Sequence, residues 1–177
     1  MFSEENHWVE GCKAFILAIL LAVIIKTFLF ASYEVRGESM LPTAQDGERF
    51  IVNKIGYEFL TPQRFDMIVF HANEEEDYIK RVIALPGESL MYIDDVLFIN
   101  GESVEEPFLD ERKEDFRGIY TQDYYFDGVI PENHVFVLGD NRPNSTDSRR
   151  LGPIPIDEIV GKVDLRFWPI SELGIMK

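Results

Sequence analysis

Residues 77–83, DYIKRVI, alternate in the way that is typical of a β-strand. Successive side chains of a strand point to opposite faces of a sheet. Lys80 therefore shares one face with a tyrosine and a valine, and this face is otherwise apolar. Arg81 lies on the other face between two isoleucines, so the pattern does not decide which of the two basic side chains is buried.

Several other segments have the same short, β-like composition, rich in Val, Ile, Phe and Tyr. Together with the segment around Lys80, here taken as residues 78–85, they are residues 49–54, 66–71, 90–100, 134–139 and 159–167. Turn residues separate them, at 86–87, 100–101 and 139–141. No helical period persists in this part of the chain, so we expect a mainly β domain built as a coiled antiparallel sheet.

A long apolar segment precedes these strands. Residues 14–31 form an 18-residue run that only a lysine and a threonine interrupt, close to the roughly 20 apolar residues that span a bilayer core. A cleaved signal peptide is the competing interpretation, but three glutamates precede the run and Leu29 would occupy position −3. We expect one retained transmembrane helix over residues 14–32, after a short tail over residues 1–13.

The rest of the chain, residues 33–177, has the usual size of one domain. The formal net charge of −15 lies almost wholly in this part, which argues against nucleic acid as a partner. Cys12 is the only cysteine, so we expect no intrachain disulfide and no cysteine-based metal site. Residues 102–133 mix acidic and aromatic side chains densely, and we interpret them as a variable acidic excursion within the domain.

Ser39 lies in residues 37–43, GESMLPT, a small-residue turn just beyond the apolar run. Its hydroxyl is a candidate nucleophile beside the bilayer, and it needs a base within hydrogen-bond reach. Neither His71 nor His134 has a recognisable triad context, although triads are assembled in space and spacing alone does not exclude one. The isolated histidines also lack the paired spacing of a zinc site, so we expect no metal and no cofactor.

Lys80 is the other candidate base. Burial lowers the pKa of a lysine because it disfavours the charged form, and the neutral amine accepts a serine proton. Taken alone, a lysine in a strand is more often an edge charge that discourages aggregation. The Ser-x-x-Lys spacing of penicillin-recognising enzymes is absent after Ser39, where Pro42 also disfavours a helix.

In combination these features resemble the type I signal peptidases, also called leader peptidases, over almost the whole chain. The motifs that carry the resemblance occur in the family's order beside an anchor. They are residues 39–43 (SMLPT), 49–54 (RFIVNK), 66–70 (DMIVF), 78–88 (YIKRVIALPGE) and 139–149 (GDNRPNSTDSR).

The resemblance implies a signal-peptidase fold and a membrane-bound serine endopeptidase with a Ser-Lys dyad. Such an enzyme removes signal peptides from exported preproteins after small residues at positions −1 and −3. It also implies an orientation that hydropathy leaves open, with a cytoplasmic tail, one pass through the cytoplasmic membrane and an extracytoplasmic catalytic domain. The implied partners are signal peptides, the lipid bilayer and, transiently, the export machinery.

The same resemblance assigns roles to single residues. Ser39 is the nucleophile, Lys80 the general base, Ser145 the residue that orients Lys80, and the Ser39 backbone N–H a donor in the oxyanion hole. Gly37 stands where some relatives have a second, side-chain donor. The residues expected to line the substrate pockets are Tyr33, Val35, Met40, Tyr78 and Ile79, and those expected to form a structural cluster are Asp140, Arg142, Asp147 and Arg149.

Two other functions compete with this one. The first is a catalytically inactive, membrane-tethered module that binds exported segments, against which the retention of Ser39 and Lys80 argues. The second is a self-cleaving protease of the repressor type, against which the anchor and the absence of a DNA-binding region argue.

Overall fold

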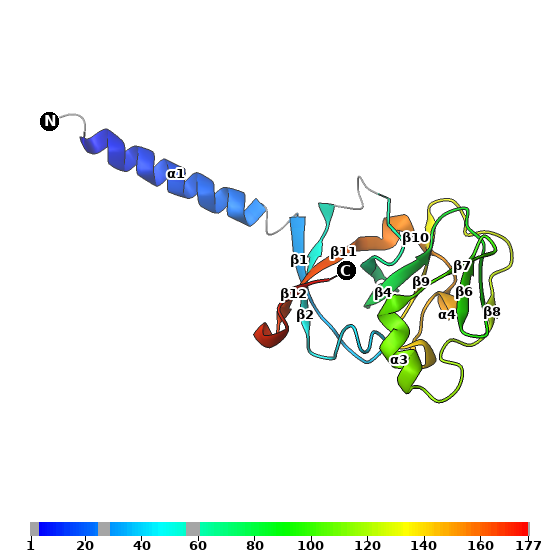
Figure 1. Cartoon of the computed structure of the whole chain (residues 1–177). Helices are drawn as coiled ribbons and strands as arrows, with labels where there is room; N and C mark the ends of the chain where they lie inside the picture. The colour runs from blue at the N-terminus through cyan, green and yellow to red at the C-terminus, as the bar shows by residue number, and fades with distance from the viewer. Residues whose placement is uncertain (1–3, 25–28, 56–60, 177) are drawn as a thin grey trace.

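The structure is a computed structural model that describes residues 4–24, 29–55 and 61–176. Its first element, helix α1 (Glu4–Ile24), lies apart from the sheets (Figure 1). The large apolar side chains described on α1 are exposed. Among the described helices, none is both long and apolar enough to span a membrane. Part of the expected span, residues 25–28, lies outside the described residues, and its end at 30–32 belongs to a strand.

An eight-stranded antiparallel sheet forms the larger layer. Seven of its strands follow the order β1-β2-β11-β3-β4-β9-β10, and β12 pairs with β11. The strands are β1 (Phe30–Glu34), β2 (Arg49–Asn53), β3 (Met67–His71), β4 (Asp77–Ala84), β9 (His134–Leu138), β10 (Ile154–Pro155), β11 (Ile159–Trp168) and β12 (Gly174–Ile175). The pairings confirm the predicted antiparallel architecture.

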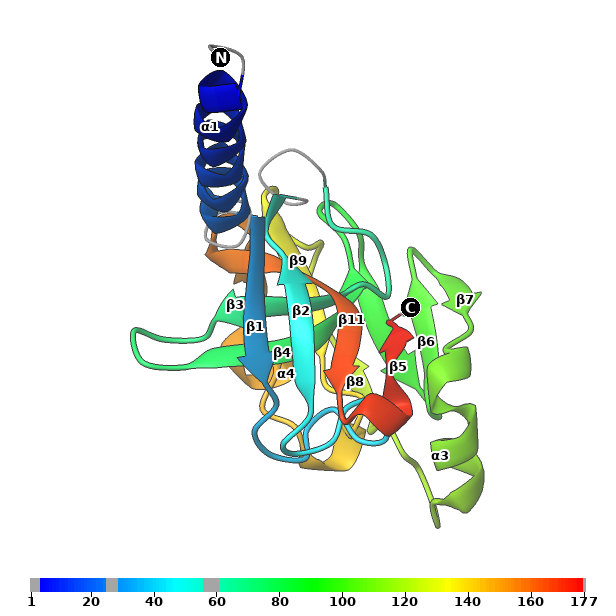
Figure 2. The ribbon, with the colours of Figure 1, turned by 90° about the vertical axis from the view of Figure 1, so that its left-hand side faces the viewer.

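The larger sheet is strongly coiled. In Figure 2, β1, β2 and β11 run side by side, and β3 and β4 run across them. The long strand β11 joins the two parts because it pairs with β2 and with β3, and its register shifts in both pairings. Such bulges bend a strand and increase its local twist.

A four-stranded sheet, in the order β7-β6-β5-β8, forms the second layer. Its strands are β5 (Leu90–Ile93), β6 (Val96–Ile99), β7 (Glu102–Val104) and β8 (Tyr124–Tyr125). The prediction of one strand over residues 90–100 was wrong, because Asp94 and Asp95 both have positive φ and form a two-residue hairpin turn. The expected turn at Asn100 and Gly101 is confirmed, since it joins β6 to β7.

Short helices fill the connections. The 102–133 excursion contains η2 (Pro107–Leu109) and α3 (Asp110–Asp115) besides β7 and β8. The residues after β9 form η3 (Arg142–Asn144), α4 (Ser148–Leu151) and η4 (Ile156–Glu158), and η5 (Ile170–Glu172) precedes β12. The excursion therefore supplies two strands of the smaller sheet.

In the part of the chain that the structure describes, buried apolar side chains form three clusters. One cluster joins the smaller sheet to β4 and β9, through side chains such as Tyr92, Leu97 and Phe136. In a second cluster, Val35 and Met40 pack with apolar side chains of β2, β3 and β11. Since Met40 follows Ser39 directly and is 1% exposed, the turn that carries Ser39 is fixed to the core.

Candidate active site

The Ser39 turn is tied down at both ends. At its start, the Val35 amide donates to the Glu48 carbonyl, and Gly37 adopts φ +87° while its amide donates to the Asp46 carboxylate at 2.7 Å. An L side chain rarely adopts that φ, which favours glycine at this position. At its end, the Ala44 amide donates to the Met40 carbonyl. These bonds fix the backbone around Ser39 before any substrate binds.

Lys80, on β4, meets the Ser39 hydroxyl. Its Nζ lies 2.8 Å from Ser39 Oγ and 2.9 Å from the carbonyl oxygen of Ile79. The Tyr78 ring lies on the same side, with its centroid 5.0 Å from Nζ. The two residues are 41 positions apart in the chain, so the pairing is a product of the fold.

Burial changes the chemistry of Lys80. The residue is 3% exposed, and burial lowers its pKa from 10.5 to about 8, although the carboxylates of Asp147 and Asp140 oppose the shift. A lysine with this pKa has an appreciable neutral fraction near pH 7, whereas an ordinary lysine has almost none. The neutral amine, at hydrogen-bond distance from a serine hydroxyl, is able to accept its proton.

A groove of about 370 Å³ contains both residues. Three walls form it, namely residues 33–40, the first half of β4, and residues 143–146 with Arg150. All five residues predicted to contact substrate, Tyr33, Val35, Met40, Tyr78 and Ile79, line it. Among the described residues, no histidine lines it, and His71 instead contacts Asp77 through Nδ1 at 2.6 Å.

Two strand edges border the groove. β1 is the end strand of the larger sheet, and it pairs with β2 on one side only. β4 pairs with β9 from Arg81 onward, so within the described residues the stretch from Asp77 to Lys80 pairs only with β3. Unpaired backbone groups on both edges suit the addition of an extended peptide.

Ser145 lies beside the dyad. A Cβ built on Gly139 would meet Ser145 Oγ at 2.3 Å and the Ser39 carbonyl oxygen at 2.4 Å, so both pack on the same face of Gly139. The Ser145 hydroxyl is buried and has no hydrogen bond of good geometry to any described residue, although its proximity contributes to the lowered pKa of Asp147. The structure thus places Ser145 next to Ser39 without a hydrogen bond to Lys80.

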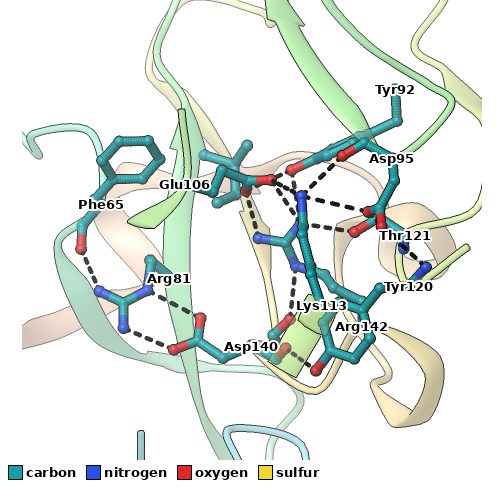
Figure 3. Close-up of polar contacts among 12 residues, drawn as sticks. Phe65, Arg81, Tyr92, Asp95, Glu106, Lys113, Tyr120, Thr121, Asp140 and Arg142 are labelled. Atoms are coloured by element: carbon teal, nitrogen blue, oxygen red, sulfur yellow. Dashed lines mark hydrogen bonds and ion pairs between the residues drawn. The ribbon is translucent and has the colours of Figure 1, made fainter. Parts of the chain in front are cut away.

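Asp140 connects the Ser39 turn to β4. Its carboxylate accepts hydrogen bonds from Arg81 Nε and NH2 at 2.9 and 2.7 Å and from Thr43 Oγ1 at 2.6 Å. Arg81 is 1% exposed and Asp140 is fully buried. Figure 3 shows the pair of Arg81 and Asp140. Because Thr43 follows Ser39 and Arg81 follows Lys80 in the chain, the Asp140 carboxylate holds the two sides of the dyad together.

Arg142 belongs to a second buried group, also drawn in Figure 3. Its NH2 lies 2.6 Å from Glu106 Oε1, and its NH1 donates to the hydroxyl of Tyr92 at 2.8 Å. Nearby, the Tyr120 hydroxyl donates to the backbone carbonyl of Asp140 at 2.7 Å. The excursion and the smaller sheet therefore hold the segment that carries Asp140 and Ser145.

Asp147 and Arg149 form the third ion pair of this region, with contacts of 2.8 and 2.9 Å. Burial opposes the charged form of Asp147, but the hydrogen bonds and charge of Arg149 outweigh it and lower the carboxyl pKa, with help from the Gly139 amide. Of the four residues predicted to cluster, only these two form an ion pair with each other, and Arg149 NH2 also donates to the Arg142 carbonyl at 2.8 Å. Asp140 and Arg142 pair with Arg81 and Glu106 instead.

Comparisons with known proteins agree on one family. Residues 8–168 match the family model described as "Signal peptidase, peptidase S26". The chain belongs to the signal peptidase family. The protein named Signal peptidase I of Bacillus caldolyticus is 44% identical over 164 residues, which cover 89% of this chain and 90% of the relative. Signal peptidase IB of Staphylococcus aureus strain Mu50 is 42% identical over 182 residues, which cover 97% and 94%.

A solved structure of a signal peptidase I, from Enterococcus faecalis V583, is also similar. It is 40% identical, superposes with a TM-score of 0.55, and covers 58% of this chain and 96% of its own. The predicted family and the mainly antiparallel β fold of signal-peptidase type are therefore confirmed, whereas the transmembrane helix that was predicted to precede this fold is not found among the described helices.

Within this signal peptidase family member, sequence reasoning missed Arg81, Thr43 and Glu106 as partners of the site. Arg81 carried a signal, since it was the second basic residue of an apolar strand. No feature of the sequence pointed to Glu106 in particular. A buried arginine requires a counter-charge, but the excursion contains many carboxylates that could supply it. Its contact with Arg142 spans 36 positions.

Proposed function

We propose that this chain is a membrane-anchored signal peptidase that cleaves exported preproteins through Ser39 and Lys80. The observation that carries the proposal is the 2.8 Å contact between Lys80 Nζ and Ser39 Oγ in a buried setting that lowers the lysine pKa to about 8. The membership of the family, whose relatives are named signal peptidases, supports the substrate class.

In the first half of the reaction, neutral Lys80 takes the proton of Ser39 as its oxygen attacks the scissile carbonyl. The negative oxygen of the intermediate needs a donor, and the Ser39 backbone N–H is suited to this role because it donates to no acceptor among the described residues. Gly37 offers no side-chain donor, and its own amide is bound to Asp46.

In the second half, the protonated Lys80 gives its proton to the leaving amine, which departs as the new N-terminus of the mature protein. Lys80 is then neutral again and takes a proton from the water that attacks the acyl-enzyme, and it gives this proton to Ser39 Oγ as the bond between Oγ and the acyl carbon breaks, which restores the free enzyme. Ser145 acts as a positioning residue beside the dyad, where its buried hydroxyl forms no hydrogen bond to a described residue.

Substrate binding follows from the two free strand edges. The residues before the scissile bond lie extended between β1 and the start of β4, and alternate side chains enter shallow apolar pockets. Tyr33, Val35, Met40, Tyr78 and Ile79 line the groove and accept small side chains at −1 and −3. Burial and a hydrogen bond to Asp77 raise the pKa of Tyr33 to about 12, so its hydroxyl stays neutral throughout the working range.

The anchor and its orientation are part of the same proposal. The apolar segment that begins at residue 14 crosses the cytoplasmic membrane once, ahead of strand β1, and leaves the catalytic domain on the extracytoplasmic side. The exposure of the large apolar side chains of α1, including Phe15, Leu17 and Leu20, supports burial in lipid. In cells that express the full chain, the protein should stay with the membrane after alkaline carbonate extraction, and protease added outside should digest it. Release by carbonate would contradict the anchor.

The catalytic assignment is tested with the full chain in detergent and a labelled preprotein, by sequencing of the new N-terminus. Cleavage after a small residue is expected, and both Ser39→Ala and Lys80→Ala should lower kcat by several orders of magnitude. Ser171→Ala and Lys54→Ala, which change the same residue types outside the groove, should cleave normally. Unchanged cleavage by Lys80→Ala would refute the dyad, and no cleavage by the parent chain would favour a binding module.

A further inference from the structure

A second hollow, of about 670 Å³, adjoins the catalytic groove. The segment from Arg142 to Arg150 separates the two, and Pro143, Ser145 and Arg150 line both. Ser145 packs against the same face of Gly139 as the Ser39 carbonyl, so the shared wall begins beside the nucleophile. An extended peptide that passes Ser39 and crosses this wall enters the hollow.

The lining of the hollow is cationic and partly apolar. Its residues include Arg117, Arg142, Arg149 and Arg150, and none of the described lining residues is an aspartate or a glutamate. Phe116 and Ile119 add exposed apolar surface, at 41% and 48% exposed. This composition is unusual in a chain with a net charge of −15.

Two of the four arginines form no ion pair with any described residue. Arg142 pairs with Glu106, and Arg149 pairs with Asp147. Arg117 and Arg150 are exposed, and within residues 4–24, 29–55 and 61–176 neither forms an ion pair. Their guanidinium groups are therefore available to a ligand that brings a carboxylate.

We propose that this hollow, lined by residues of the ranges 116–122 and 142–150, binds the part of the preprotein that follows the scissile bond and favours an acidic side chain there. The inference rests on the proposed function, which assigns the strand edges at β1 and β4 to the residues before the bond. The residues after it then leave across the third wall of the groove, toward Arg150. Charge complementarity selects a carboxylate, and Phe116 and Ile119 contact its apolar neighbours.

The test uses the full chain in detergent and a set of otherwise identical preproteins. One residue at a time, from +2 to +6 after the cleavage site, is Glu, Gln or Lys, and kcat/KM is measured for each. At one or two adjacent positions, Glu should exceed Lys by about threefold to tenfold, as expected for two solvent-exposed charge pairs. The preference should shrink in 0.5 M salt, because salt screens exposed charges.

The decisive quantity is the Glu-to-Lys ratio within one enzyme, from which any general loss of activity cancels. Arg117→Gln with Arg150→Gln should reduce the ratio to nearly one, while Lys54→Gln, which removes a cation outside both hollows, should leave it unchanged. A ratio near one at every position in the parent, or a preference that survives in the double variant, would overturn the inference. Absence of all cleavage would instead count against the proposed function.

Discussion

Replacement of Lys80 by methionine should stabilise the folded chain near neutral pH while it abolishes activity. The fold holds Lys80 at 3% exposure, where burial lowers its pKa from 10.5 to about 8. At about 1.36 kcal/mol per pKa unit, this difference means that the charged lysine destabilises the folded state by roughly 3 kcal/mol below pH 8. Methionine has a similar length and no charge. It also removes the hydrogen bonds to the Ser39 hydroxyl and to the Ile79 carbonyl, at a cost of about 1 kcal/mol each, so the expected net gain at pH 7 is roughly 1 kcal/mol.

The pH dependence gives the sharper test. Between pH 8 and 10.5 the unfolded state keeps the Lys80 proton and the folded state has lost it, so the stability contributed by this group rises with pH over that window. The advantage of Lys80→Met should therefore be largest below pH 8, vanish near pH 9 and reverse toward pH 10.5, where the parent keeps its two Lys80 hydrogen bonds without the penalty of a buried charge. Because other groups titrate in the same range, the measured quantity is the difference between the two proteins.

The assay is urea unfolding of the full chain in detergent, followed by the intrinsic fluorescence of the domain, at intervals from pH 7 to 10.5. Lys54→Met, which replaces a lysine that is not buried, shows how much the change from lysine to methionine alters the free energy of unfolding without burial. A difference that stays constant from pH 8 to 10.5, or a Lys80→Met variant that is less stable than the parent at pH 7, would refute the argument that burial lowers the pKa of Lys80.

Two further substitutions test the supports of the site. Gly139→Ala should lower kcat at least tenfold with a smaller change in KM. The new Cβ would lie 2.3 Å from Ser145 Oγ and must displace that side chain. A fully active variant would contradict the close packing. Glu106→Gln should lower the free energy of unfolding by roughly 3–5 kcal/mol, because it leaves the buried Arg142 without its counter-charge. Glu105→Gln, at the exposed neighbouring residue, should have little effect in the same urea titration.

The sequence was most informative where the physical signal is local. Short alternating segments and turn residues predicted the antiparallel strands, because a strand with one buried face must alternate. The turn at Asp94 and Asp95 was not predicted, because the positive φ of these residues leaves no periodic pattern in the sequence. Strand β1 was not predicted either. Residues Phe30 to Glu34 continue directly from an apolar run, and only their pairing with β2 shows that they form a strand.

The candidate site shows the same division. Ser39 and Lys80 were predicted through motifs, but alternation did not decide between Lys80 and Arg81 as the buried base. The structure buries both, because the two faces of β4 meet different partners: Lys80 faces the Ser39 hydroxyl, and Arg81 faces Asp140. Such partners are brought together by long-range contacts, for which a single sequence has no periodic signal.

The central claim is that neutral Lys80 is the base for Ser39, and the dependence of kcat/KM on pH tests it most directly. kcat/KM reports the ionisation of the free enzyme. With a preprotein that does not titrate between pH 6 and 10, kcat/KM should rise about tenfold per pH unit up to an inflection near pH 8, the pKa of buried Lys80. An inflection below pH 7, or a profile that is flat from pH 6 to 9, would contradict a lysine base.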